Sequence, residues 1–389
     1  TQGAHSLIRP VNKYGEEKYM LTVCDLNMCS GCGLCAEICP KNAINIVDDL
    51  DVYNAVIHEN KCISCNSCHK VCPNNNPIRC VFPSSWYQGW AVDDKIRQNS
   101  SSGGFATAIS YSFVKNGGIV CSCVFSGGKF CFDFAYTCDE LGKFTGSKYV
   151  KSDPQSVYKE IKDKIRDNYR VLFIGLPCQV ASIKRYVGDK LGEQLYTIDL
   201  ICHGTPSPKL LELFLKQYGL SLDKLNNISF RHKFKFQVDG DCKSIVTDGV
   251  SDRYSTAFLN GLTYTENCYN CIYAQGKRVS DLTIGDSWGS EINDYEIKAG
   301  ISLVLCMSEK GSDLLKNSSL HLEAVDLNNA IFHNHQLESP VKKPDKREVF
   351  FGGIKKGYRF NNMVYKSFPK QCLRQDIKGI LIKMHIIKN

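Results

Sequence analysis

Two runs of cysteines with the same spacing offer the clearest chemistry in the sequence. The first run contains Cys29, Cys32, Cys35 and Cys39, and the second contains Cys62, Cys65, Cys68 and Cys72. In each run, three cysteines lie three positions apart, and the fourth follows four positions later, directly before a proline. Three thiolates at this spacing can hold three corners of an iron–sulfur cubane, while the fourth cysteine is carried towards the other cluster. The predicted ligands of the first [4Fe–4S] cluster are Cys29, Cys32, Cys35 and Cys72, and those of the second are Cys62, Cys65, Cys68 and Cys39.

Structural zinc is the alternative for these two runs. Zinc sites typically use separated C-x-x-C pairs with a long spacer, rather than two triplets that are each closed by Cys-Pro. The apolar stretches "AINIV" and "NAVIHEN" between the runs predict two short strands. The pattern therefore favours a small α+β module of the bacterial ferredoxin type over residues 21–82. Cys24 and Cys80 lie outside the spacing, and we interpret them as ordinary, partly buried cysteines.

Beyond residue 83, apolar strands alternate with amphipathic helices, which predicts an α/β domain with a mixed, largely parallel sheet. Ligands of such sheets collect where strands end and helices begin. Cys178 follows the buried strand "RVLFIG", and Cys202 ends the next strand in "QLYTIDLIC". Cys268 and Cys271 form a C-x-x-C further along the chain. These residues alone leave four interpretations open, namely a four-thiolate cluster, a zinc site, a redox C-x-x-C and inert buried thiols.

Six short motifs occur in order along this region: "SSGGFATAIS", "GSKYV", "GLPCQ", "ICHG", "CYNC" and "SDLTIGDSWG". This ensemble resembles the coenzyme F420 hydrogenase/dehydrogenase beta subunit family over residues 84–330. The resemblance implies bound FAD, a [4Fe–4S] cluster beside it and an amino-terminal two-cluster ferredoxin module. It also implies that the ligands of this third cluster are Cys178, Cys202, Cys268 and Cys271.

A flavin site is predicted from the same motifs. "SSGG" opens a helix whose free amides and positive end suit a pyrophosphate, although the same residues would also serve as a plain helix cap and turn. The resemblance adds "GSKY", in which Lys148 would compensate a phosphate or the reduced flavin, unless it is a solvated surface lysine. It also adds "DLTIGD", which is equally consistent with a strand and a tight turn. The predicted FAD-binding residues are Ser101, Ser102, Gly103, Gly104, Gly146, Ser147, Lys148, Tyr149, Asp281, Thr283, Gly285 and Asp286.

Three other features have less specific interpretations. His203 follows a predicted cluster ligand and could deliver a proton, but we interpret it as a packed or hydrogen-bonding histidine. "HNHQ" at 333–336 is interpreted as a loop, because no cysteine or carboxylate cluster flanks it. "KGILIKMHIIKN" near the carboxyl end permits a membrane-surface helix, although packing on its own domain is the commoner role of such a pattern.

The composition is that of a globular protein with two or three domains. The chain has 389 residues, of which 43% are hydrophobic, with a net charge of +8 and 21 cysteines. Cysteines in a reducing compartment more often bind metal than form disulfides. No apolar run reaches the roughly 18 to 20 residues of a membrane span, and no secretory signal is recognised, so we predict a cytoplasmic protein. The lysines are scattered without an aromatic–basic pattern, which argues against nucleic-acid binding.

The predicted organisation is an amino-terminal extension (1–20), a two-cluster ferredoxin domain (21–82), a domain for FAD and the third cluster (83–330) and a carboxyl-terminal extension (331–389). We predict an iron–sulfur flavoprotein oxidoreductase, in which three [4Fe–4S] clusters exchange electrons with FAD. The FAD would exchange hydride with coenzyme F420 or a similar conjugated substrate. The expected partners are a redox donor or acceptor, such as a ferredoxin or a deazaflavin, and a partner subunit or second copy. The alternatives are a non-catalytic electron-transfer subunit and a redox adaptor linked to polysaccharide synthesis.

Overall fold

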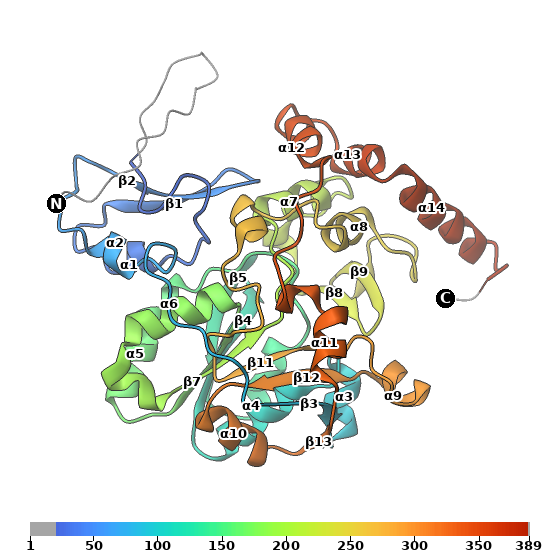
Figure 1. Ribbon diagram of the computed structural model, residues 1–389. Coiled ribbons are helices and arrows are strands. Elements are labelled where there is room, and N and C mark those ends of the chain that lie inside the picture. The colour runs from blue at the N-terminus through green and yellow to red at the C-terminus, as the bar shows by residue number, and fades with distance from the viewer. Residues whose placement is uncertain (1–20, 388–389) are drawn as a thin grey trace.

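The computed structural model describes residues 21–387, in which a small amino-terminal region rests on a larger α/β body (Figure 1). The predicted extension 1–20 lies outside the described residues. The small region contains the short helices α1 (Leu34–Glu37) and α2 (Ser67–Val71), and both pack against α6 (Pro177–Val187) of the body. Cys35 on α1 and Cys68 on α2 therefore lie on helices that contact the body.

The small region is built around an antiparallel hairpin of β1 (Ile44–Asp48) and β2 (Tyr53–Ile57). These strands are the two predicted from "AINIV" and "NAVIHEN". An isolated bridge between Thr22 and Val56 adds the incoming chain to the edge of the hairpin. One face of the hairpin is buried against the cysteine-containing loops, so the strands support the loops from behind.

An eight-stranded sheet forms the centre of the larger body. Its strands lie in the order β13 (Leu320–Glu323), β3 (Ser85–Ala91), β12 (Ser302–Cys306), β11 (Leu282–Asp286), β7 (Leu195–Leu200), β6 (Val171–Gly175), β4 (Ile119–Ser126) and β5 (Lys129–Ala135). The central strands β11, β7, β6 and β4 run parallel to one another, and the other neighbouring pairs are antiparallel. The predicted mixed sheet is confirmed, but the expectation of largely parallel pairing is wrong. Tight connections, such as the Gly127–Gly128 turn between β4 and β5, return the chain directly to a neighbouring strand and so force antiparallel pairing.

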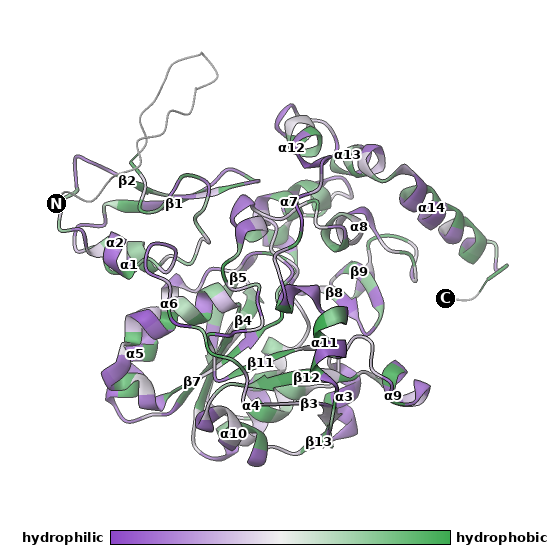
Figure 2. Cartoon of the chain, viewed as in Figure 1, coloured by the Kyte–Doolittle hydropathy of each residue, from purple (hydrophilic) through white to green (hydrophobic). Residues whose placement is uncertain are grey.

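Helices cover both faces of this sheet. The helices that cover it include α4 (Phe105–Lys115), α5 (Tyr158–Arg166), α6 and α10 (Glu309–Lys316). Along β6, Val171 and Phe173 pack with α5 and α6, whereas Leu172 and Ile174 pack with α4 and α10. This two-sided burial explains why "RVLFIG" is continuously apolar, and the central strands stand out as hydrophobic in Figure 2.

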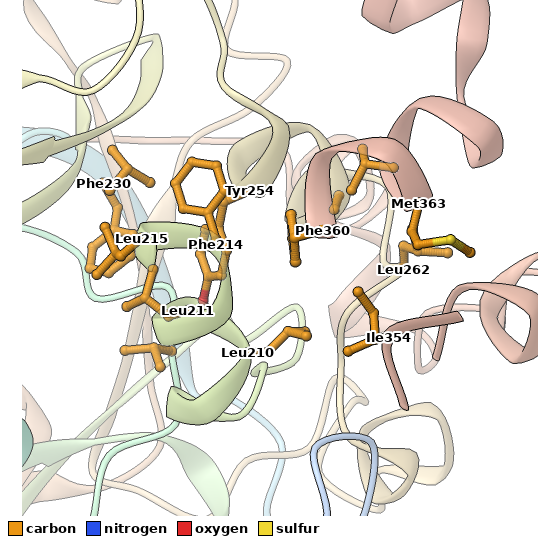
Figure 3. Close-up of a cluster of buried hydrophobic side chains, with 14 of the residues drawn as sticks. Leu210, Leu211, Phe214, Leu215, Phe230, Tyr254, Leu262, Ile354, Phe360 and Met363 are labelled. Carbon is orange, nitrogen blue, oxygen red and sulfur yellow. The ribbon is translucent and has the colours of Figure 1, made fainter. Parts of the chain in front are cut away.

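A second core lies beside the main sheet. It is built from α7 (Pro208–Lys216), α8 (Arg253–Leu259), α12 (Arg347–Lys355), α13 (Phe360–Ser367) and a small antiparallel sheet of β8 (Ile228–His232), β9 (Lys235–Gly240) and β10 (Lys243–Ser244). Phe214 lies at its centre, with ring centroids 5.6 Å from Tyr254 and 5.5 Å from Phe360 (Figure 3). The segment after residue 330 therefore shares a buried core with earlier parts of the chain. The remaining helices are α3 (Asp94–Asn99), α9 (Asp294–Ala299), α11 (Leu327–His333) and α14 (Pro369–Lys383).

Two interpretations of the carboxyl-terminal segment are tested by the fold. The predicted loop "HNHQ" is wrong, because α11 ends at His333 and a 3-10 helix follows at His335–Leu337. Helix α14 packs on the body through Cys372 and Gly379 but leaves apolar side chains such as Ile380 exposed. Only one side of α14 therefore packs on the body, and the other side is exposed to solvent. Among the described residues 21–387, no helix is long and apolar enough to cross a membrane.

Candidate functional site

The first group of thiols draws on both cysteine runs. Cys29 and Cys32 lie in the loop before α1, Cys35 lies on α1, and Cys72 lies at the end of α2. Burial raises the pKa of Cys35, and the neighbouring thiols of Cys32, Cys29 and Cys72 raise it further. The structure thus brings Cys72 to the first run, in the arrangement that an exchange of fourth cysteines between clusters requires.

Cys24, which the spacing excludes, also lies in this group. Its thiol hydrogen-bonds with Cys29 and Cys72, which raises the pKa of Cys24, and its side chain is buried. The Gly31 N–H donates to Cys29 Sγ at 3.4 Å, and such bonds from amides to ligand sulfurs tune iron–sulfur sites. Gly31 has a φ of 72°, and a Cβ there would lie 2.9 Å from Cδ1 of Tyr53, so glycine lets this amide approach the sulfur.

Of the predicted ligands of the second cluster, Cys62 and Cys65 lie in the loop before α2, Cys68 lies on α2, and Cys39 lies beyond the end of α1. Burial raises the pKa of Cys68, and the neighbouring thiols of Cys62 and Cys65 raise it further. Backbone amides again point at the sulfurs, since the Ser64 N–H lies 3.4 Å from Cys62 Sγ and the Ala43 N–H lies 3.3 Å from Cys39 Sγ. Cys65 is exposed, so this group lies closer to solvent than the first.

The third group contains the four cysteines from the larger body. Cys178 is the second residue of α6, Cys202 lies two residues beyond β7, Cys268 lies in a 3-10 helix (Glu266–Asn270), and Cys271 follows that helix. Burial raises the pKa of Cys178, and Cys271, Cys202 and Cys268 raise it further. Burial also raises the pKa of Cys202 to about 12, with contributions from Cys268 and Cys271. Cysteines spread over almost one hundred positions of sequence are therefore gathered at one place.

The chemistry of this donor set fits a metal cluster. Burial and neighbouring thiols raise the pKa of Cys178, Cys202 and Cys271, so these thiols cannot ionise together unless positive charge lies among them. A donor set made only of thiolates suits iron–sulfur clusters and zinc. Within the described residues 21–387, no three Cys, His, Asp or Glu side chains form a group that would hold a single metal ion.

A pocket of about 410 Å³ adjoins the third group. Nine of the twelve predicted FAD-binding residues line it, namely Ser101, Ser102, Gly104, Gly146, Ser147, Lys148, Tyr149, Gly285 and Asp286. Cys202 and His203 line the same pocket. The two segments "SSGG" and "GSKY" meet directly, because the Ser147 N–H donates to Ser101 Oγ at 3.1 Å. Cys202 of the third cysteine group and the predicted flavin segments thus line one cavity.

The other three predicted residues lie behind the pocket wall. Asp281 accepts hydrogen bonds from the N–H and hydroxyl of Thr197 at 2.8 and 2.7 Å, which ties β11 to β7. The Thr283 hydroxyl donates to Asp199 at 2.7 Å. The Gly103 N–H donates to the Ser302 hydroxyl at 2.9 Å. Their polar groups are therefore used inside the protein, and they support the residues that line the pocket.

Sequence reasoning missed Arg231, which lies on β8 and lines the pocket. Its guanidinium forms an ion pair with Asp286. Burial alone would lower the pKa of Arg231, but the ion pair with Asp286 outweighs burial, so the pKa is raised. Tyr149 stacks on Phe258 with ring centroids 4.3 Å apart, which makes an aromatic wall. Lys148 donates to the carbonyl oxygens of Phe144 and Thr145 at 2.9 and 3.0 Å, and burial lowers its pKa. Lys148 is thus a partly buried pocket residue rather than a solvated surface lysine.

His203 is held in place by the "HNHQ" segment. Its Nδ1 lies 2.8 Å from Gln336 Nε2, which in turn lies 2.7 Å from His335 Nε2. Burial lowers the pKa of His203 to about 4, and the neighbouring His335 lowers it as well. These contacts agree with a packed, hydrogen-bonding histidine, and they give the "HNHQ" segment a place beside the pocket.

Comparison with known family models gives two matches within the chain. Residues 168–329 match the family model for the carboxyl-terminal part of the coenzyme F420 hydrogenase/dehydrogenase beta subunit. Over these residues, the larger body is similar to the carboxyl-terminal part of that beta subunit. Residues 28–76 match the 4Fe-4S dicluster domain, which includes all eight cysteines of the two runs. The beta subunit match includes Cys178, Cys202, Cys268 and Cys271, whereas "SSGG" and "GSKY" precede it.

Solved structures give a more distant likeness. One chain of the F420-reducing [NiFe] hydrogenase complex from Methanosarcina barkeri is 19% identical, with a TM-score of 0.46, and the match covers 66% of this chain and 91% of that chain. The comparison with curated proteins gave no match. Together, the two family matches describe an iron–sulfur protein with a domain from an oxidoreductase subunit.

Proposed function

We propose that the chain is an iron–sulfur flavoprotein oxidoreductase with three [4Fe–4S] clusters and FAD. The first cluster would be held by Cys29, Cys32, Cys35 and Cys72, the second by Cys62, Cys65, Cys68 and Cys39, and the third by Cys178, Cys202, Cys268 and Cys271. FAD bound in the pocket would supply the conversion between single electrons and a hydride. The match to the 4Fe-4S dicluster domain supports the first two ligand sets, and the shared position of the four later cysteines supports the third.

The position of Cys202 carries this proposal. Cys202 belongs to the third thiol group and also forms part of the pocket wall. A cluster held by this group would therefore lie beside any ligand in the pocket. Such proximity is what electron transfer between a cluster and an organic cofactor requires.

Contacts between the first and third groups support a relay of electrons into the body. The Tyr158 hydroxyl donates to the Cys32 carbonyl oxygen at 2.8 Å, and the Ser182 hydroxyl donates to the Cys178 carbonyl oxygen at 2.7 Å. Ser182 also hydrogen-bonds with the Cys32 side chain. The side chains of Cys32, Tyr158 and Cys178 pack in one buried apolar cluster, so the junction between the two groups is shielded from water.

The pocket offers complementary chemistry to a flavin dinucleotide. Its positive groups are Lys148, Arg231 and the amino-terminal end of α4, which begins after Gly104 and suits phosphate. Tyr149 and Phe258 provide an aromatic surface for a planar ring. We infer that hydride exchange takes place with coenzyme F420 or a similar conjugated molecule, because the matched family is named for this coenzyme.

The decisive experiment offers hydride donors to anaerobically purified protein. Dithionite is first used to show that clusters and flavin can be reduced, and then reduced F420, NADH and NADPH are supplied in turn while the flavin absorbance is recorded. The proposal predicts that at least one of these donors bleaches the flavin.

A non-catalytic electron-transfer subunit is the second candidate, because the matched family model describes a subunit. Bleaching by dithionite together with no response to any of the three hydride donors would favour this candidate over the oxidoreductase.

A further inference from the structure

Lys151 reaches from the larger body into the loop of the first cysteine run. It follows directly after the "GSKYV" motif, and its backbone N–H is fixed by a hydrogen bond to the Pro206 carbonyl oxygen at 2.9 Å. Its ammonium donates to the Ser30 carbonyl oxygen at 3.0 Å and lies 5.0 Å from the ring centroid of Tyr53. Ser30 is the residue next to Cys29, so the ammonium lies at the loop that carries the first thiol group.

The Lys151 ammonium is buried without a carboxylate to balance it. The residue is only 6% exposed, and within residues 21–387 no Asp or Glu forms an ion pair with it. A buried ammonium with one carbonyl partner and an aromatic ring is costly unless a negative charge lies nearby. The cysteine thiols of the adjoining loop can carry such a charge.

The thiols concerned belong to two different groups. At the third group, the Lys151 backbone is bonded to Pro206, four residues beyond Cys202. The next residue, Ser152, accepts a hydrogen bond at its carbonyl oxygen from Gln179, the neighbour of Cys178, at 3.1 Å. At the first group, the ammonium itself donates to the Ser30 carbonyl oxygen, next to Cys29. Lys151 therefore lies beside the loop of the first group and beside two segments that carry the third.

We propose that Lys151 is a shared electrostatic residue that raises the reduction potentials of the first and third clusters together, and so keeps electron exchange between them balanced. Adding an electron to a cluster makes it more negative, and a fixed positive charge in a region of low dielectric stabilises that reduced state. The inference rests on the proposed function, because it requires clusters at both groups. The second cluster serves as an internal reference, because the Lys151 ammonium contacts the loop of the first cysteine run rather than that of the second.

Lys151→Gln tests the proposal, because glutamine removes the charge and can still donate to the Ser30 carbonyl oxygen. The potentials of the three clusters are measured by EPR-monitored redox titration of anaerobic protein. We expect the first and third clusters to become harder to reduce by about tenfold in the one-electron equilibrium, or about 59 mV, while the second cluster is unchanged. Lys151→Arg should restore both potentials, and Lys159→Gln, which removes an exposed lysine of α5, should leave all three unchanged.

Unchanged potentials of the first and third clusters in Lys151→Gln, or a change in only one of them, would overturn the inference. If Lys151→Gln does not retain its clusters, the requirement for charge is tested by iron content instead: Lys151→Arg must then bind iron at the wild-type level, and a deficit in Lys151→Arg would overturn it. Wild-type protein without a signal from the third cluster would refute the proposed function itself. This outcome differs from those that refute only the role of Lys151.

Discussion

Arg231 and Asp286 form a two-pronged ion pair, with N–O distances of 2.6 and 2.9 Å, in the wall of the pocket beside the third cysteine group. The pair joins the small sheet at β8 to the end of β11 in the main sheet. The guanidinium also lies 5.0 Å from the ring centroid of Phe236 and 5.7 Å from that of Trp288. A cation is thereby fixed against aromatic rings at the place where we propose that FAD binds.

We predict that Arg231→Gln weakens the retention of FAD by about tenfold. The variant loses a positive charge in the pocket and leaves the Asp286 carboxylate partly buried without its partner, which repels an anionic ligand. The measurement is the FAD dissociation constant, obtained by titrating the flavin-depleted protein. The matched control is Arg253→Gln, because Arg253 pairs with Asp376 of α14, away from the pocket. Equal losses of FAD affinity in both variants would show that Arg231 acts on stability rather than on the flavin.

Cys178→Ala is expected to remove the third cluster and leave the first two in place. Cys178 is the member of the third group that lies on α6, beside the Ser182 contact with Cys32. Iron content should fall by about four atoms per chain, and the two remaining clusters should still be visible by EPR. Reduction of FAD by a reduced ferredoxin, which donates its electrons through the clusters, should then be lost. Full transfer to FAD in this variant would contradict the role of the third group.

The exchange of fourth cysteines between the runs can be tested by comparing variants. Because Cys72 lies with Cys29 and Cys35, Cys72→Ala should damage the same cluster as Cys29→Ala. The EPR spectra of these two variants should match each other and differ from that of Cys62→Ala. A Cys72→Ala spectrum that resembles Cys62→Ala would mean that each run holds its own cluster.

The Tyr158 hydroxyl is predicted to stabilise the contact between the small region and the body. Tyr158→Phe leaves the Cys32 carbonyl oxygen without this buried donor, at a cost of about 1 kcal/mol, which should lower the melting temperature by about 2 °C. Tyr169→Phe is the matched control, because that side chain is half exposed. Anaerobic thermal unfolding of both variants measures the difference, and equal melting temperatures would show that the hydroxyl contributes nothing.

The parts of the site that could be predicted from sequence are those set by local spacing. The two cysteine runs bring their sulfurs together through short loops, and Cys178 is placed by a strand that runs straight into a helix. "SSGG" could also be recognised, because a helix start exposes its amides wherever the helix lies. These features are set by residues that are neighbours in the sequence, so they form in the same way wherever the segment lies in the fold.

The parts that sequence reasoning missed depend on tertiary contacts. Arg231 meets Asp286 across 55 positions of sequence, and no local pattern marks β8 as part of the pocket. Asp281 and Thr283 resemble pocket residues in their motif, yet their side chains brace β11 against β7, because strand alternation does not say which side faces a ligand. Lys151 has no distinguishing neighbours in the sequence, and its role appears only when the first cysteine loop packs beside it.

We propose that a single chain holds three cubanes and one flavin. The most direct measurement is iron, sulfide and flavin analysis of anaerobically purified wild-type protein. The protein concentration is determined by amino acid analysis, so that each content is expressed per chain. We expect about twelve irons, about twelve sulfides and about one FAD per chain, since each cubane contributes four of each inorganic atom. About eight irons with no flavin would contradict it, because the third cysteine group and the pocket would then have neither of the cofactors that we assign to them.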